Sequence, residues 1–106
     1  MLLKMEEIKI NLELLLSSLP VTCTLINIQK LKLAFQEYKS LIASLPGKFS
    51  AIKKYCEKIF DFIKAKIELI EKNTISRKSK NIFQEAVDQL KSQIEMVLLT
   101  IRAESA

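Results

Sequence analysis

The chain has 106 residues, of which 49% are apolar, and a net charge of +5. One Gly and two Pro leave little material for turns, which favours long helices with short connections and excludes an intrinsically disordered chain. The sequence contains no His, so it lacks the commonest general base and the commonest metal ligand, and a single Gly excludes phosphate-binding loops. We therefore expect a protein that is not an enzyme and has no metal or cofactor.

The first periodic segment covers residues 1–19. Its apolar side chains recur at steps of four and three residues, which is the pattern of a helix that buries one seam. Leu3, Ile10 and Leu14 lie beside that seam and widen the apolar stripe beyond what one core contact needs. Pro20 is expected to end this helix or to start the next one, because proline cannot continue a helix. The seam residues are Met1, Met5, Ile8, Leu12, Leu15 and Leu19.

The second predicted helix ends at Leu45-Pro46-Gly47. Thr22 or Thr24 is its expected N-cap, because a hydroxyl there accepts a hydrogen bond from an otherwise free backbone N–H. Gly47 is expected to close the helix in the left-handed conformation that glycine tolerates best. The seam residues are Ile28, Leu31, Phe35, Tyr38, Ile42 and Leu45.

The third predicted helix runs from about Ser50 to about Lys72. Residues 73–79 form the predicted connection, in which Ser76 or Ser79 caps the last helix. We expect that helix to fray in the final residues, RAESA. The seams are Ile52, Cys56, Ile59, Phe60, Ile63, Ile67 and Ile70 in the third helix, and Phe83, Ala86, Val87, Leu90, Ile94, Val97, Leu98 and Ile101 in the last.

The predicted connections of about three to seven residues force neighbouring helices to run antiparallel. The sequence therefore predicts an all-α fold, an up-down antiparallel four-helix bundle with coiled-coil-like seams, in a single domain of residues 1–106. A three-helix bundle whose first helix docks on a partner or a neighbour is the alternative.

The two cysteines indicate an intracellular protein. Cys23 and Cys56 are 33 residues apart, and small secreted domains usually carry more cysteines than two. Cys56 lies on an apolar seam, which favours a buried, reduced thiol. Residues 10–29 contain one charged residue, Glu13, but polar residues and Pro20 interrupt the segment, so we expect no membrane span. The expected location is cytoplasmic or otherwise intracellular.

Positive charge is concentrated in residues 48–80, which hold nine Lys and one Arg against four acidic residues. One interpretation is a solvated helix face with the pairs Asp61–Lys64, Lys64–Glu68 and Glu68–Lys72, which are spaced for contact along a helix. The other is a surface that binds nucleic acid or another polyanion. Its contacts would be Lys53, Lys54, Lys58, Arg77, Lys78 and Lys80.

Aliphatic side chains exceed what the four seams require, and exposed apolar patches mark interaction sites. The first and last helices hold much of this surplus, and they are neighbours in an up-down bundle. We therefore expect an interaction protein (an adaptor, assembly subunit or chaperone-like protein) that binds a protein partner or forms a homo-oligomer. The alternatives are nucleic-acid binding through residues 53–80 and a membrane-associated or toxin-neutralising immunity-type protein. The candidate partner-binding residues are Leu3, Ile10, Leu14, Met96 and Leu99.

Overall fold

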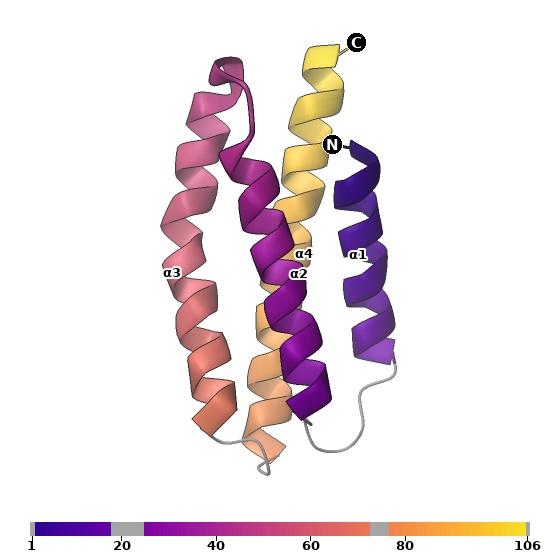
Figure 1. Cartoon of the computed structure of the whole chain (residues 1–106), viewed down its shortest axis with the longest axis vertical. Coiled ribbons are helices and arrows are strands. Elements are labelled where there is room, and N and C mark those ends of the chain that lie inside the picture. The colour runs from indigo at the N-terminus through magenta and orange to yellow at the C-terminus, as the bar shows by residue number, and fades with distance from the viewer. Residues whose placement is uncertain (1, 18–24, 73–76, 106) are drawn as a thin grey trace.

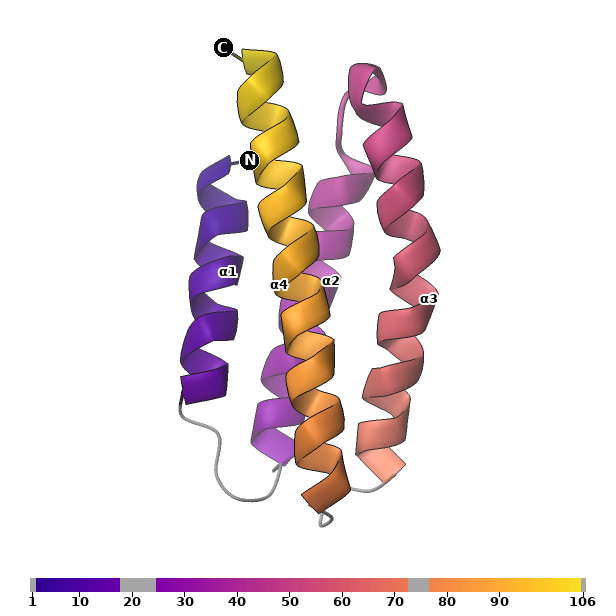
Figure 2. The ribbon, with the colours of Figure 1, turned by 180° about the vertical axis from the view of Figure 1, so that it is seen from behind.

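The computed structural model describes residues 2–17, 25–72 and 77–105. Its elements are the α-helices α1 (Leu2–Ser17), α2 (Leu25–Ala43), α3 (Ser50–Lys72) and α4 (Arg77–Ser105), with a short 3-10 turn, η1 (Gly47–Phe49), before α3. Each helix runs antiparallel to the one before it, and the four lie side by side (Figures 1 and 2). The predicted all-α, up-down four-helix bundle is confirmed.

The order of the helices around the bundle follows the order of the chain. α1 packs between α2 and α4, and α3 packs between the same two helices on the other side (Figures 1 and 2). Met5, Ile8 and Leu12 of α1 are at most 1% exposed. The alternative in which the first helix docks outside a three-helix bundle is therefore wrong, because α1 contributes buried residues to the same core.

The core is built from the four predicted seams. Every seam residue of α1, α2 and α4 within the described ranges is buried, and in α3 Ile52, Ile59 and Phe60 are half-buried against the core. The ring of Phe60 meets those of Phe35 and Tyr38 edge to face, with both pairs of centroids 5.8 Å apart, which is a favourable geometry for aromatic pairs. The seam positions Met1 and Leu19 lie outside the described residues.

The connection from α2 to α3 differs from the prediction. Gly47 does not adopt a positive φ. Pro46 interrupts the chain instead, with φ −60° and ψ 160°, and the 3-10 turn that follows carries Phe49 into the core. A Cβ added at Gly47 would meet nothing within 4 Å, so neither backbone conformation nor packing requires glycine here.

The start of α4 also differs from the prediction. The helix begins at Arg77, so Ser79 lies inside it and cannot be its N-cap. Arg77 and Lys78 belong to its first turn and not to a loop. At the other end α4 remains helical to Ser105, although the final residues, RAESA, were predicted to fray. The predicted caps and breaks at Pro20, Thr22, Thr24 and Ser76, together with Cys23, lie outside the described residues.

No helix within the described ranges is long and apolar enough to cross a lipid bilayer.

Truncating a core residue of α1 tests whether this helix contributes to the monomer. Leu12 is fully buried, and Leu12→Ala is expected to lower the free energy of unfolding by about 2–5 kcal/mol. Leu25 of α2 is 64% exposed, so Leu25→Ala is the control and should change the free energy of unfolding by less than about 0.5 kcal/mol. Urea denaturation followed by circular dichroism gives both values. Equal, small effects would mean that α1 does not pack in the bundle.

Candidate protein-interaction surface

α1 carries an aliphatic stripe on the side that points away from the core. Leu3, Ile10 and Leu14 are 83%, 55% and 60% exposed. Together with Glu7 they follow one another at steps of four, three and four residues, so the four side chains share one face of the helix. The aliphatic surplus of the first helix is therefore exposed to solvent.

α2 carries a second stripe of the same kind. Ile26 and Leu33 are 65% and 57% exposed, and Lys30 and Glu37 continue the same steps of four, three and four residues. Two aliphatic residues and two charges of opposite sign therefore alternate along this edge of the helix.

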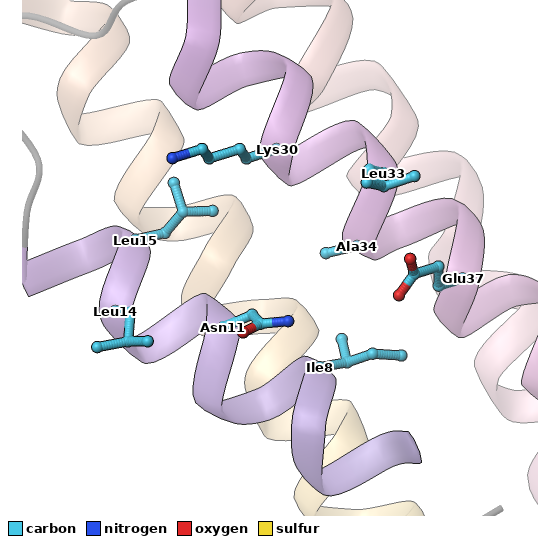
Figure 3. Close-up of a pocket in the computed structure, with 8 residues that line it drawn as sticks. All are labelled: Ile8, Asn11, Leu14, Leu15, Lys30, Leu33, Ala34 and Glu37. Carbon is cyan, nitrogen blue, oxygen red and sulfur yellow. The ribbon is translucent and has the colours of Figure 1, made fainter.

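The two stripes open on the same side of the bundle, which we call the α1–α2 face. Leu14 from α1 and Lys30, Leu33 and Glu37 from α2 line one shallow groove of about 320 Å³ between these helices. Figure 3 shows Lys30 and Leu15 at one end of the groove, and Glu37 and Ile8 at the other. The residues of the α1–α2 face are Leu3, Glu7, Ile10, Leu14, Ile26, Lys30, Leu33 and Glu37.

The side where α1 meets α4 has a different character. Three ion pairs cross it: Arg102–Glu6, Lys9–Glu95 at 3.5 Å and Lys91–Glu13 at 3.6 Å. Residue numbers rise along α1 while they fall along α4, as antiparallel helices require. Each pair is partly exposed and contributes little to stability. The pairs nevertheless make this seam polar on its outer side.

The five residues predicted to bind a partner are not brought together. Leu3, Ile10 and Leu14 lie on the α1–α2 face. Leu99 is 68% exposed on α4, while Met96 is half-buried and lines a groove of about 570 Å³ between α3 and α4. Two residues that the prediction did not include among the partner-binding set, Ile26 and Leu33, complete the α1–α2 face.

Several lysines of the basic stretch have structural partners. Lys53 donates a hydrogen bond to the carbonyl of Ala43 at 3.2 Å, where the last carbonyls of α2 lack helical partners. Lys66 pairs with Glu85 at 2.7 Å and lies 4.7 Å from the ring centroid of Phe62.

The other candidate anion contacts do not converge on one described site. Lys54 and Lys58 are exposed on α3, and Lys80 is half-buried on α4. The side chains of Arg77 and Lys78 lie outside the described part of the structure. Binding of nucleic acid through residues 53–80 therefore stays a prediction.

The ion pairs predicted along α3 are not formed. Among the described residues, Asp61, Lys64, Glu68 and Lys72 make no ion pair within 4 Å, whereas this helix pairs with its neighbours through Lys66–Glu85 and Glu71–Lys32. Pairing between exposed groups on one helix is worth a few tenths of a kcal/mol and costs side-chain freedom. The ion pairs that α3 does form join it to a neighbouring helix.

A buried polar group lies where α2, α3 and α4 meet. The hydroxyl of Tyr38 is 3.3 Å from Cys56 Sγ and 3.2 Å from Gln93 Oε1. Because a hydroxyl has one proton, Tyr38 can donate to only one of them, and a chain in which the thiol donates to Tyr38 and Tyr38 donates to Gln93 satisfies both contacts. Gln93 Nε2 is buried without a hydrogen-bond partner. The predicted burial of Cys56 as a free thiol is confirmed.

Burial controls the ionisation of two members of this group. Removal from water raises the pKa of the Cys56 thiol, and the contact with the Tyr38 hydroxyl offsets part of that rise. Burial also raises the pKa of the Tyr38 phenol, with Cys56 adding to the effect. Both groups are therefore neutral near pH 7, and Cys56 is a poor nucleophile because only the thiolate reacts.

Within the described residues, no three His, Cys, Asp or Glu side chains gather closely enough to hold a metal ion. The chain matches no protein-family model, no curated protein and no solved structure. The interpretation of its surface therefore rests on the geometry of this molecule.

Removing the Tyr38 hydroxyl tests the buried polar group. Tyr38→Phe leaves the Gln93 amide and the Cys56 thiol without this partner, so the free energy of unfolding should fall by about 1–3 kcal/mol. Tyr55→Phe is the matched control, because Tyr55 is half exposed and its hydroxyl can bind water instead. In the double variant Tyr38→Phe with Gln93→Leu, part of the loss should return. No recovery would show that Gln93 is not the group left unsatisfied.

The thiol of Cys56 should make stability depend on pH in the alkaline range. Its raised pKa in the folded state means that its contribution is complete below the ordinary thiol pKa of about 8.5 and is lost as pH rises above that value. Urea denaturation at pH of about 7 and about 9.5 should therefore show a steeper fall for the wild type than for Cys56→Ala. Parallel curves would show that the thiol ionises equally in both states.

Proposed function

We propose that this chain is a non-enzymatic interaction protein that binds another protein, or a second copy of itself, through the α1–α2 face. The observation that carries the proposal is the exposure of five aliphatic side chains on that one face: Leu3, Ile10, Leu14, Ile26 and Leu33. Clusters of exposed aliphatic side chains are uncommon on monomeric proteins except where they interact.

The chemistry of the α1–α2 face supports a protein as its partner. Aliphatic side chains gain about 25 cal/mol for each Å² that they remove from water, and they make no directional bonds that would suit a small polar ligand. The groove between α1 and α2 is shallow and about 320 Å³ in volume, so it accommodates one or two side chains of a partner helix better than a whole ligand. Amphipathic helices bind in such grooves.

The last helix has a smaller part in this proposal than the sequence indicated. In the described part of α4, Leu99 is the one large aliphatic residue that is strongly exposed, and the ion pairs between α1 and α4 flank the neighbouring seam. Polar groups at that seam would have to lose water on contact with a partner, which costs free energy. Five of the eight residues of the α1–α2 face are aliphatic, and these gain free energy when a partner removes them from water.

Polar substitutions on α1 test the proposed function. The triple variant Leu3→Gln, Ile10→Gln, Leu14→Gln should lose association, with binding weakened at least about tenfold, because buried aliphatic anchors carry most interface energy. The assay is affinity capture from the native cell extract, half of it treated with nuclease, followed by light scattering of purified complexes. Circular dichroism should show an unchanged helical bundle.

A matched control tests whether the loss of any exposed leucine weakens association. Leu25 and Leu69 are 64% and 46% exposed and do not belong to the α1–α2 face, so Leu25→Gln, Leu69→Gln should keep association. Equal loss in both variants would contradict the assignment of the face. Loss of every bound species after nuclease treatment would favour the nucleic-acid hypothesis, whose binding weakens steeply with salt.

A further inference from the structure

The groove between α1 and α2 has opposite charges at its two ends. Lys30 lies at one end, and among the described residues it forms no ion pair. Glu37 lies at the other end (Figure 3), where Lys4 is 4.0 Å from Glu37 and 3.9 Å from Glu7. One cation and two anions leave that end with a net charge of −1. The groove is positive at one end and negative at the other, with Leu33, Ala34 and the amide of Asn11 between the two ends.

From this arrangement we propose that the α1–α2 face binds a second copy of the same chain, as a two-fold symmetric dimer; this rests on the proposed function and names its partner. The two-fold axis would lie in the plane of the face and run across both helices, close to Leu33. In an isologous contact each patch meets itself in reverse. A surface with opposite charges at its two ends is therefore complementary to its own copy.

The spacing along α2 fits this symmetry. Lys30 and Glu37 are seven residues apart, and the midpoint between them falls at Leu33 and Ala34. Rotation about an axis there places Lys30 opposite Glu37 of the second copy, and the same contact occurs twice. A parallel arrangement with the axis along α2 would instead place Lys30 against Lys30 and Glu37 against Glu37. Like charges at an interface cost several kcal/mol, so the antiparallel arrangement is favoured.

The aliphatic residues of α1 fit the same axis. Ile8 lies at the Glu37 end of the groove and Leu15 at the Lys30 end (Figure 3), so the axis crosses α1 between these two residues. Ile10 then lies within about one helical turn of the axis, as Leu33 does on α2, so both aliphatic residues approach their own copies. Charge and aliphatic surface are therefore complementary in one and the same orientation.

A charge exchange on α2 tests the dimer directly. The wild type should be a dimer by sedimentation velocity. Lys30→Glu and Glu37→Lys should each weaken it by about tenfold or more, because each places like charges together at two symmetric contacts. The double variant Lys30→Glu with Glu37→Lys restores opposite charges and should restore the dimer. Lys54→Glu is the control, because Lys54 is exposed on α3, and it should leave the dimer intact.

A cross-link at the axis provides a second, independent readout. In a chain whose two natural cysteines are replaced by Cys23→Ser and Cys56→Ala, the substitution Leu33→Cys should form a disulfide-linked dimer on mild oxidation, since a residue near a two-fold axis meets its own copy. Leu25→Cys, elsewhere on α2, should not. Unfolding curves on each variant check that the bundle is intact.

The outcomes separate this inference from the proposed function. A wild type that stays monomeric up to about 1 mM, where even a weak contact would be occupied, overturns the dimer, and so does a double charge exchange that fails to restore association. If that monomer still captures a nuclease-resistant protein through Leu3, Ile10 and Leu14, the proposed function stands with a different partner. If the α1 triple variant keeps every partner, both fail.

Discussion

The burial of one aliphatic seam of α4 against the other three helices is the constraint on which the rest of the structure depends. α4 packs on α1, α2 and α3, and its seam from Phe83 to Ile101 is buried throughout its length. With 29 residues α4 is the longest helix, whereas α1 has 16. α1 and α3 make no substantial contact with each other, so each is held by α2 and α4. Because the core takes one seam from each helix, the opposite side of every helix must face water.

This constraint explains why the α1–α2 face is notable. Most outward positions of α3 and α4 are polar or charged, as expected where a helix meets solvent. On α1 and α2, by contrast, aliphatic residues occupy outward positions that need no apolar side chain for the fold. These side chains remain in contact with water in the monomer. They therefore contribute little to its stability, because only burial removes apolar surface from water. The proposed contact with another molecule would account for a surface that does not stabilise the chain itself.

The buried polar group of Tyr38, Cys56 and Gln93 has a complementary role. It joins α2, α3 and α4 at one level of the bundle, and polar groups in a core are satisfied in only one alignment of the helices. Aliphatic seams alone tolerate small shifts of one helix along another. The Tyr38 hydroxyl therefore helps to define the register of three helices, while the ion pairs between α1 and α4 define that of the fourth.

The helices and the core followed from the sequence, because steps of three and four residues report directly which side of a helix is buried. Boundaries were less predictable. Pro46, and not Gly47, interrupts the chain after α2, and α4 begins at Arg77, before Ser79, which was one of the two serines considered as its cap. The largest difference concerned the surface. The spacing of Leu3, Ile10 and Leu14 shows that they lie opposite the seam, but not whether that stripe opens toward α2 or α4. The arrangement of the helices around the bundle decides this, and it depends on three-dimensional packing that no local pattern encodes.

The measurement that tests the central claim most directly is a dilution series followed by methyl NMR. If the α1–α2 face is the contact between two copies, the methyl signals of Leu3, Ile10, Leu14 and Leu33 should shift together with concentration along one binding curve. The signals of Leu69 and Leu99, which lie on other sides of the bundle, should stay unchanged. Spectra that are independent of concentration, or shifts centred on Leu69 and Leu99, would contradict the account.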